Sequence, residues 1–222
     1  MIKEIDFRKT VDLSFKGFSL LIEPEEVPDQ RINRVLIPQE YIEKRVRALA
    51  EKICSDYSHI QSITVVVVLK GAVVFASDLV REIYRLGGPD IKIEFFKVNG
   101  YGNEMKSKGE VERNIKIELE PNNLQGRDVL IVEDLVDQGF TLSALETYIV
   151  NKSNARSLKI CVLLDKKLNN PSDSIVKIRN KLQCDYTGFK IYDKWVAGYG
   201  MDSVEDLRNL PFIVEINEDY YM

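Results

Sequence analysis

The residues best suited to chemistry lie close together between Val129 and Thr141, where the chain reads VLIVEDLVDQGFT. Two adjacent acids, Glu133 and Asp134, follow a run of branched apolar residues, and Asp137 comes three positions later. Carboxylates at this spacing can bind ribose hydroxyls, hold a magnesium ion or move a proton. The glycine and the helix start that follow can bind a phosphate group through main-chain amides.

An ordinary junction between a strand and a helix is the alternative interpretation of this stretch. In that case the acids would cap the helix and face water, as single acids at such junctions usually do. Three acids within five residues, directly after a fully apolar strand, are uncommon. We therefore favour a ligand site, whose chemistry the spacing alone leaves open.

The neighbouring elements predict how this stretch is held in place. Val129–Val132 has the pattern of a strand buried on both faces, and Ser62–Leu69 and Ser157–Leu164 are further buried strands. Ile91–Val98 is predicted as another strand. Helical sequence lies between them, for example an amphipathic segment from about residue 38 to residue 56. Alternating strands and helices predict an α/β fold with a mostly parallel, twisted sheet flanked by helices.

Polar residues follow three of these predicted parallel strands. Lys70-Gly71 follows the first, the acids at 133–137 follow the central one, and Asp165-Lys166-Lys167 follows the last. Because ligands bind at the carboxyl edge of open α/β sheets, we expect these residues to meet there. Lysines beside carboxylates suit an anionic substrate with a metal ion bound between them.

The remaining segments are shorter or less regular. Asn99–Arg113 is rich in glycine and charge, and a loop of this length inside a compact α/β domain is more often a lid than a plain connection. Tyr101 is its only large ring. Further short strands are predicted at Ser14–Leu21, Asn114–Leu119, Cys184–Phe189, Trp195–Tyr199 and Phe212–Ile216.

Length and composition limit the classes of protein that the chain can belong to. A chain of 222 residues can form one domain with a large core, alone or with a small appendage. Its 31 basic residues stand against 35 acidic ones without basic clusters, which argues against nucleic-acid binding. No apolar run is long enough to cross a membrane, and early acids argue against a signal peptide. Cys54, Cys161 and Cys184 have no metal-binding spacing and predict reduced thiols, so we expect a cytoplasmic protein.

The stretch VLIVEDLVDQGFT is similar to the phosphoribosyl-pyrophosphate motif of the type I phosphoribosyltransferases. Four further segments, VLIP at 35–38, VLKG at 68–71, LLDKK at 163–167 and YDKWVAGYGMD at 192–202, resemble the hypoxanthine-guanine phosphoribosyltransferases within that family. The resemblance runs in one register from about residue 17 to residue 216. An acid-acid motif alone would be moderate evidence, whereas the full ordered set is specific.

The resemblance implies a type I phosphoribosyltransferase fold in a single domain, residues 1–222. The core would span about residues 40–190, and a small hood would form from about 1–38 and 190–222. The implied reaction is the magnesium-dependent transfer of 5-phosphoribose from phosphoribosyl pyrophosphate to N9 of hypoxanthine or guanine. The products would be IMP or GMP and pyrophosphate, which is a purine-salvage reaction. Relatives form dimers or tetramers, so a homodimer or homotetramer is expected.

The resemblance also assigns roles to the central stretch. Glu133 and Asp134 would hold the ribose 2- and 3-hydroxyls, directly or through Mg²⁺, and Asp137 would lie near purine N7 as the general base or proton partner. The main-chain amides of the loop, with the Thr141 hydroxyl, would bind the 5-phosphate at the helix N-terminus. The residues of this phosphoribosyl-pyrophosphate loop are Asp137, Gln138, Gly139, Phe140 and Thr141.

Lys70, Gly71 and Arg208 would form the pyrophosphate site. In the family the peptide bond equivalent to Leu69–Lys70 is typically cis, so we expect a cis bond here. Without the family match, Lys70 would be interpreted as a solvated lysine at a helix start. Arg208 would likewise be interpreted as one half of a surface salt bridge.

The implied base site lies near the C-terminus. Trp195 would stack on the purine with Leu135 on its other side, although the only tryptophan of a chain is more often a core residue. Lys194 would donate to O6, with Lys166 close to the same edge of the base. An ammonium group at this place would reject adenine. The lysine ammonium and the 6-amino group of adenine are both hydrogen-bond donors, so neither would find an acceptor in the other.

Backbone groups and a second metal site complete the implied assignments. Main-chain carbonyls of Val196 and Asp202 would accept from the 2-amino group of guanine. The Asp202 carboxylate would bind a second Mg²⁺, alongside a first ion at the two acids of the central strand. Gly100 and Tyr101 would belong to the lid that closes over the reacting centre.

The chain departs from the family pattern at several of these places. Gln138 and Phe140 replace the usual Thr and Lys or small aliphatic residue, Gly100 replaces a serine, and Asp165 replaces an apolar residue. These changes concern rate and base preference more than reaction type. Two alternatives stay open: a narrower guanine or xanthine specificity, and a weakly active nucleotide-sensing regulatory homologue. The retained Asp137 argues against the regulatory alternative.

Overall fold

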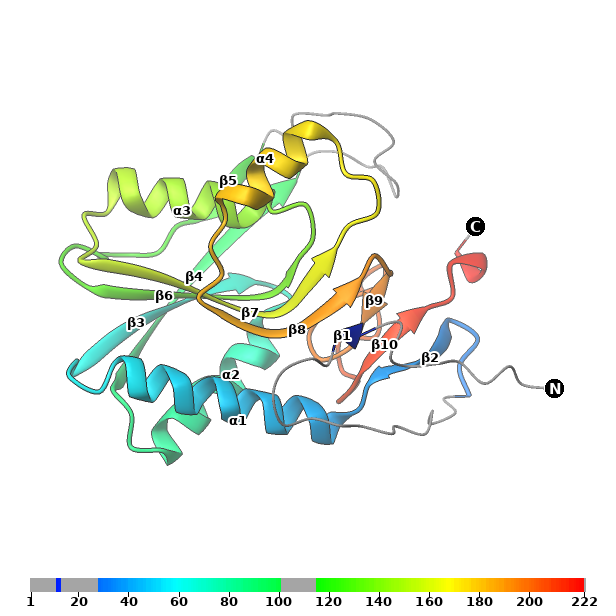
Figure 1. Cartoon of the computed structure of the whole chain (residues 1–222), viewed down its shortest axis with the longest axis horizontal. Helices are drawn as coiled ribbons and strands as arrows, with labels where there is room; N and C mark the ends of the chain where they lie inside the picture. Colours follow the sequence, from blue (N-terminus) through cyan, green and yellow to red (C-terminus); the bar gives the residue numbers. More distant parts are fainter. Residues whose placement is uncertain (1–10, 13–27, 101–114, 222) are drawn as a thin grey trace.

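The computed structural model describes residues 11–12, 28–100 and 115–221 (Figure 1). Its main sheet has the strand order β1-β8-β7-β6-β3-β4-β5. The inner strands run parallel to their neighbours, and β1 and β5 pair antiparallel at the two edges. In chain order the strands are β1 (Val11–Asp12), β3 (Ser62–Leu69), β4 (Asp90–Gly100), β5 (Ile115–Leu119), β6 (Asp128–Val136), β7 (Ser157–Lys167) and β8 (Tyr186–Tyr192).

Two layers of helices cover this sheet. The helices α1 (Gln39–Asp56) and α2 (Val73–Arg85) lie on one face, and α3 (Phe140–Lys152) and α4 (Asp173–Lys181) lie on the other (Figure 1). Alternate valines of β3 enter the two cores, Val65 towards α1 and α2 and Val66 towards α3. Burial on both faces explains why the inner strands are apolar without interruption.

A second, smaller sheet lies beyond the carboxyl ends of the central strands (Figure 1). It consists of β2 (Ile32–Ile37), β10 (Ile213–Ile216) and β9 (Val196–Ala197), all paired antiparallel, and the 3₁₀ helix η2 (Glu218–Tyr220) follows it. Its apolar side chains form a separate core cluster. Strands from the N-terminal and C-terminal parts of the chain thus join in one small sheet.

Most predicted elements are confirmed, with differences in extent. β7 and β8 are longer than predicted, so that Asp165-Lys166-Lys167 belongs to β7 and Lys190 to β8. The helix α4 was not predicted. The predicted strand at Ser14–Leu21 and the lid residue Tyr101 lie outside the described residues. Gly100, the other lid residue, is the last residue of β4.

The part of the chain that the structure describes contains no disulfide and no helix suited to crossing a membrane. None of its helices is both long and apolar enough to cross a membrane. Cys54, Cys161 and Cys184 are all free thiols, as predicted, and burial raises the pKa of the Cys161 thiol above its ordinary value.

Candidate active site

The acids of the central stretch lie at the carboxyl end of β6, between the ends of β3 and β7. Glu133 is buried and Asp134 is half-buried, and the Asp134 amide donates to Glu133 Oε1 at 3.3 Å. Burial, and then repulsion from the Asp134 carboxylate, raises the pKa of Glu133 well above its ordinary value. The strand therefore ends in a buried acid whose charged form is disfavoured by its surroundings and would be stabilised by a cation or a hydroxyl donor.

This burial makes a testable prediction about stability. An acid whose folded-state pKa is raised contributes stability below its unfolded pKa and loses it as the pH rises through the folded pKa. Without ligand, the melting temperature of Glu133→Gln is therefore expected to rise increasingly above that of the wild type as the pH increases beyond the ordinary glutamate pKa of about 4.3. Thermal unfolding across this range measures the difference. Glu43→Gln, an exposed glutamate on α1, is the matched control, and parallel curves for the wild type and Glu133→Gln would contradict the prediction.

The loop after β3 lies directly against Asp134. The Leu69–Lys70 peptide bond is cis, as expected from the family resemblance. A Cβ atom at Gly71 would overlap the Asp134 carboxylate, and a Cβ at Gly200 would overlap the Gly71 carbonyl oxygen. Glycine is therefore required at both positions to bring this loop, the end of β6 and the C-terminal segment into contact.

The phosphate-binding candidate is the turn between β6 and α3. Gly139 has a φ of +87°, and a Cβ there would meet Leu182 Cδ1 at 2.7 Å, so both conformation and space require glycine. The first amides of a helix have no intrahelical acceptor, and no side chain caps α3. Phe140 and Thr141 supply amides at this helix start, and both side chains are half-buried. Gln138, directly before this glycine, is half-buried.

Asp137 faces a buried lysine from the neighbouring strand. Lys166 Nζ lies 3.8 Å from Asp137 Oδ2 and 3.9 Å from Asp193 Oδ1. The Lys166 side chain is only 9% exposed, whereas about half of the Asp137 side chain is exposed. Asp193 also accepts from the Asn169 amide at 3.0 Å. A ligand at this edge would thus meet an ammonium group and two carboxylates, of which Asp137 is open to solvent.

Lys194 has its partner in the small sheet, and Trp195 has its partner just after η2. Lys194 Nζ lies 2.9 Å from Glu215 Oε1, and Arg34 binds the other oxygen of the same carboxylate. The Trp195 ring lies 5.1 Å from the Tyr221 ring, tilted by 42°. Val196 is buried in β9, and Leu135 is half-buried against the core under α1 and α2. The structure thus brings Lys166, rather than Lys194, next to Asp137.

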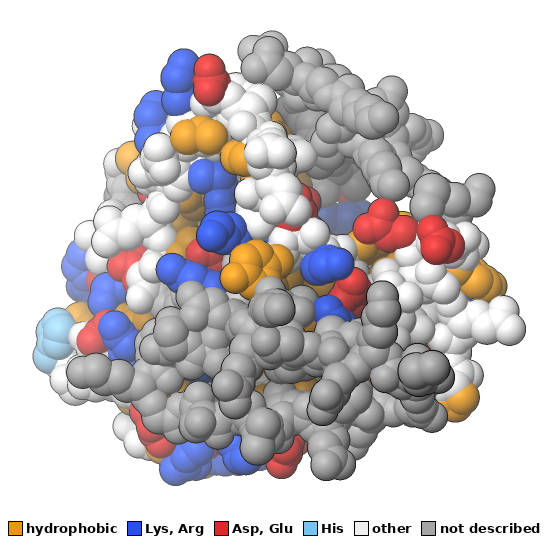
Figure 2. Space-filling view, turned by 45° about the vertical axis from the view of Figure 1, so that its right-hand side comes forward, with side chains coloured by type: hydrophobic (Ala, Val, Ile, Leu, Met, Phe, Trp, Pro, Cys, Tyr) orange, Lys and Arg blue, Asp and Glu red, His pale blue; other side chains and the backbone are white. Residues whose placement is uncertain are grey.

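The predicted pyrophosphate residues are joined by acids of the C-terminal segment. Glu205 Oε2 lies 3.0 Å from Lys70 Nζ and 3.2 Å from Arg208 Nη2, so one carboxylate bridges the two cations. Arg208 also binds Asp202 Oδ1 at 2.9 Å and donates to the Gly200 carbonyl at 3.0 Å. Hydrogen bonds from Lys70 and then Arg208 hold the pKa of Glu205 below its ordinary value. Figure 2 shows the face that the right-hand side of Figure 1 presents, where basic side chains gather near the centre and acidic ones lie among them and to the right.

Sequence reasoning missed Asp193 and Glu205. Asp193 lies inside the segment YDKWVAGYGMD that carried the resemblance, so its acidic side chain was the available signal. Glu205 lies three positions before Arg208, but its second partner, Lys70, is 135 residues away in the chain. Only the folded structure brings that pair together.

Magnesium is the metal that these residues could hold. Within the described ranges, no group of three or more acid, histidine or cysteine side chains is placed to hold an ion by itself. Mg²⁺ often uses only one or two protein carboxylates and takes its other ligands from water and substrate phosphates. Glu133 and Asp134 supply such oxygens, whereas Asp202 is bound to Arg208. The donors fit an ion that arrives with a phosphorylated substrate.

Comparisons with known proteins agree with this architecture. Residues 37–203 match the family model described as a phosphoribosyl transferase domain. The hypoxanthine-guanine phosphoribosyltransferase of Aquifex aeolicus is 36% identical over 185 residues, which are 83% of this chain and 95% of that protein. The Bacillus subtilis protein of the same name is 37% identical over 82% of this chain and 92% of its own length.

Solved structures are similar in fold as well. A hypoxanthine-guanine phosphoribosyltransferase from Bacillus anthracis has a TM-score of 0.69 at 33% identity, covering 84% of this chain and 98% of that one. A hypoxanthine phosphoribosyl transferase from Trypanosoma cruzi has a TM-score of 0.72 at 29% identity, covering 89% and 97%. The chain therefore belongs to the phosphoribosyltransferase family, among the hypoxanthine-guanine phosphoribosyltransferases.

Proposed function

We propose that this protein transfers 5-phosphoribose from phosphoribosyl pyrophosphate to N9 of hypoxanthine or guanine, giving IMP or GMP and pyrophosphate in purine salvage. The observation that carries the proposal is the meeting of three groups at one sheet edge. These are an uncapped helix start for the 5-phosphate, the two β6 acids for ribose, and a lysine-acid pair for the base. Membership in the family supports the same reaction.

The reaction requires pyrophosphate to leave C1 of ribose while positive charge develops on the sugar ring. Fixed charges and dipoles supply most of the help in such a step. The Thr141 end of α3 would hold the 5-phosphate, and Glu133 and Asp134 would hold the ribose hydroxyls. Mg²⁺, when bound with the substrate, would neutralise charge on the leaving pyrophosphate. Asp137, open to solvent at the end of β6, would take the proton that the purine loses.

Glu205 gives the proposed pyrophosphate site a testable property. In the absence of ligand its carboxylate bridges Lys70 and Arg208, so pyrophosphate has to displace it. Glu205→Gln is therefore expected to lower the KM for pyrophosphate in the reverse reaction by about two- to fivefold, the modest range typical of exposed ion pairs. Steady-state pyrophosphorolysis of the nucleotide measures this KM. Glu51→Gln on α1 is the control, and an unchanged or higher KM for Glu205→Gln would contradict the competition.

The base contacts follow from the same edge of the sheet. Lys166 is buried beside Asp137 and is the better-supported donor to O6, because its ammonium lies 3.8 Å from Asp137 and 3.9 Å from Asp193, whereas the Lys194 ammonium is bound more closely, 2.9 Å from Glu215. Trp195 would supply an aromatic surface for the purine. The carbonyls of Val196 and Asp202 would meet its 2-position, which sequence does not specify. An ammonium at O6 favours a 6-oxopurine over adenine.

Steady-state kinetics with four bases separates the remaining alternatives. Hypoxanthine, guanine, xanthine and adenine are compared at saturating phosphoribosyl pyrophosphate and Mg²⁺. We expect turnover with hypoxanthine and guanine and little with adenine. Turnover with guanine or xanthine alone would support the narrower specificity, and nucleotide binding with weak turnover would support the regulatory homologue.

The proposal extends to assembly and location. We propose a homodimer or homotetramer in the cytoplasm, with no nucleic-acid or membrane partner. Apolar side chains exposed on α2 and β4, at Val73, Val74, Ile93 and Phe95, support a surface for a second copy. The three free cysteines support a reducing compartment. Light scattering at several protein concentrations measures the assembly.

A further inference from the structure

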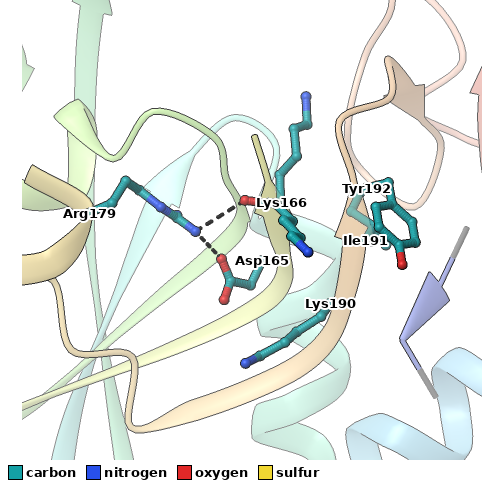
Figure 3. A pocket seen from close by; sticks show the side chains of 7 residues that line it. Asp165, Lys166, Arg179, Lys190, Ile191 and Tyr192 are labelled. Atoms are coloured by element: carbon teal, nitrogen blue, oxygen red, sulfur yellow. Dashed lines mark hydrogen bonds and ion pairs between the residues drawn. The ribbon is translucent and has the colours of Figure 1, made fainter. Parts of the chain in front are cut away.

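A cavity of about 260 Å³ lies behind the catalytic edge, between the ends of β7 and β8 and the helix α4 (Figure 3). The strand register places Asp165 opposite Lys190 and Lys167 opposite Tyr192. Residues two apart on a strand face the same side, so these four share one face, while Lys166 between them turns its ammonium to Asp137. The cavity is lined by Asp165, Lys166, Lys167, Arg179, Lys190, Ile191 and Tyr192.

The charge of this lining is strongly positive. Arg179 is paired with Asp165, the only acid of the lining, as Figure 3 shows. Lys167 lies 5.8 Å from the centre of the Tyr192 ring. Among the side chains that the structure describes, no carboxylate lies within ion-pair distance of Lys167 or Lys190. Four basic residues, Lys166, Lys167, Arg179 and Lys190, stand against one acid in this lining, and this excess creates a positive potential that attracts anions.

We propose that this cavity binds a phosphate-bearing anion, either inorganic phosphate or a small phosphomonoester, at a site that adjoins the catalytic one through Lys166. Its volume is below the roughly 300–1,000 Å³ of cavities for drug-sized ligands, so the ligand is a phosphate group with at most a small substituent. Lysine is a point-charge phosphate binder, and Arg179 adds a planar donor at the wall.

Arg179 connects this cavity with the catalytic residues. Its guanidinium donates to the Lys166 carbonyl at 3.1 Å and to the carbonyl of Val136 at 3.4 Å. Val136 is the residue before Asp137. A bound anion that draws on Arg179 therefore acts on the main chain next to both Lys166 and Asp137. For the same reason Arg179 variants would disturb the catalytic loop, so the clean probes of the cavity are Lys167 and Lys190.

Inorganic phosphate is the probe, titrated by isothermal calorimetry into the wild type and into Lys167→Gln/Lys190→Gln at low salt. We expect one class of phosphate sites to be lost from the titration curve of the double variant, because its affinity for phosphate falls at least about tenfold. Lys92→Gln, an exposed lysine on β4, is the matched control and keeps the wild-type curve. Identical curves for the wild type and the double variant would overturn the proposal.

Two further variants test where the anion lies. Thr141→Val is expected to weaken phosphate binding at the proposed catalytic site. The class of phosphate sites that the double variant loses is expected to keep its wild-type affinity in Thr141→Val. Asp12→Asn removes the acid that the register of β1 and β8 places opposite Lys190, and it is expected to leave phosphate affinity equal or higher. Loss of that class in Thr141→Val would assign all phosphate binding to the catalytic site and overturn the proposal. Because no turnover is measured, the result does not depend on the proposed function.

Discussion

Asp137→Ala is expected to lower kcat by about 10²-fold or more while nucleotide affinity stays close to that of the wild type. Asp137 lies at the open end of β6, and about half of its side chain is exposed, so truncation does not open a cavity in the core. General acid-base catalysis by a positioned side chain contributes about 10²- to 10⁴-fold. The loss should therefore appear in turnover, whereas phosphate and ribose contacts remain.

The structure offers a matched control for this prediction. Asp193 contacts the same Lys166 ammonium, at 3.9 Å against 3.8 Å for Asp137. If Asp137 acted only as a counter-charge for Lys166, Asp193→Asn would reduce kcat to a similar degree. We expect a much smaller effect from Asp193→Asn. Single-turnover nucleotide formation and equilibrium nucleotide binding measure the two quantities, and an unchanged kcat in Asp137→Ala would remove Asp137 from the proton-transfer role.

Lys166→Met is expected to lower kcat/KM for hypoxanthine and guanine by about 10- to 100-fold. Methionine keeps most of the length and apolar volume of the lysine stem, so the buried site stays filled. The ammonium group is lost, and with it a charge-assisted hydrogen bond to O6, a contact typically worth about 1.5–3 kcal/mol. Discrimination against adenine should fall in parallel, because the donor that rejects its amino group is gone.

Lys194→Met is the comparison that distinguishes the two lysines. The Lys194 ammonium is bound to Glu215 in the small sheet, so its removal is expected to change kcat/KM by less than about fivefold. Steady-state kinetics of both variants with three bases, hypoxanthine, guanine and adenine, gives the required ratios. A large loss in Lys194→Met together with a small one in Lys166→Met would reverse the assignment and restore Lys194 as the O6 donor.

The mostly parallel sheet and its central strands were predictable because burial on both faces leaves a clear pattern. Val65, Val66 and Val132 are apolar for the same physical reason, contact with helices on either side. The helix α4 left no such pattern, because none of its residues is buried. The two-residue strand β1 is too short to carry any periodicity.

The acids and the glycine of the candidate site were predictable from spacing, but several partners were not. Lys166 and Lys194 are both lysines near strand ends in the sequence, and only the fold shows that one contacts Asp137 and the other contacts Glu215. The bridge from Glu205 to Lys70 joins segments far apart in the chain. Contacts of this kind depend on tertiary packing, which no local pattern encodes.

The most direct test of the proposed function is nucleotide formation by the purified chain. Hypoxanthine or guanine is mixed with phosphoribosyl pyrophosphate and Mg²⁺, and the nucleoside monophosphate and pyrophosphate are measured together. The proposal predicts equal amounts of both products with the wild type and a strongly reduced rate with Asp137→Ala. Absence of nucleotide from hypoxanthine, guanine, xanthine and adenine alike, with a folded protein, would contradict it.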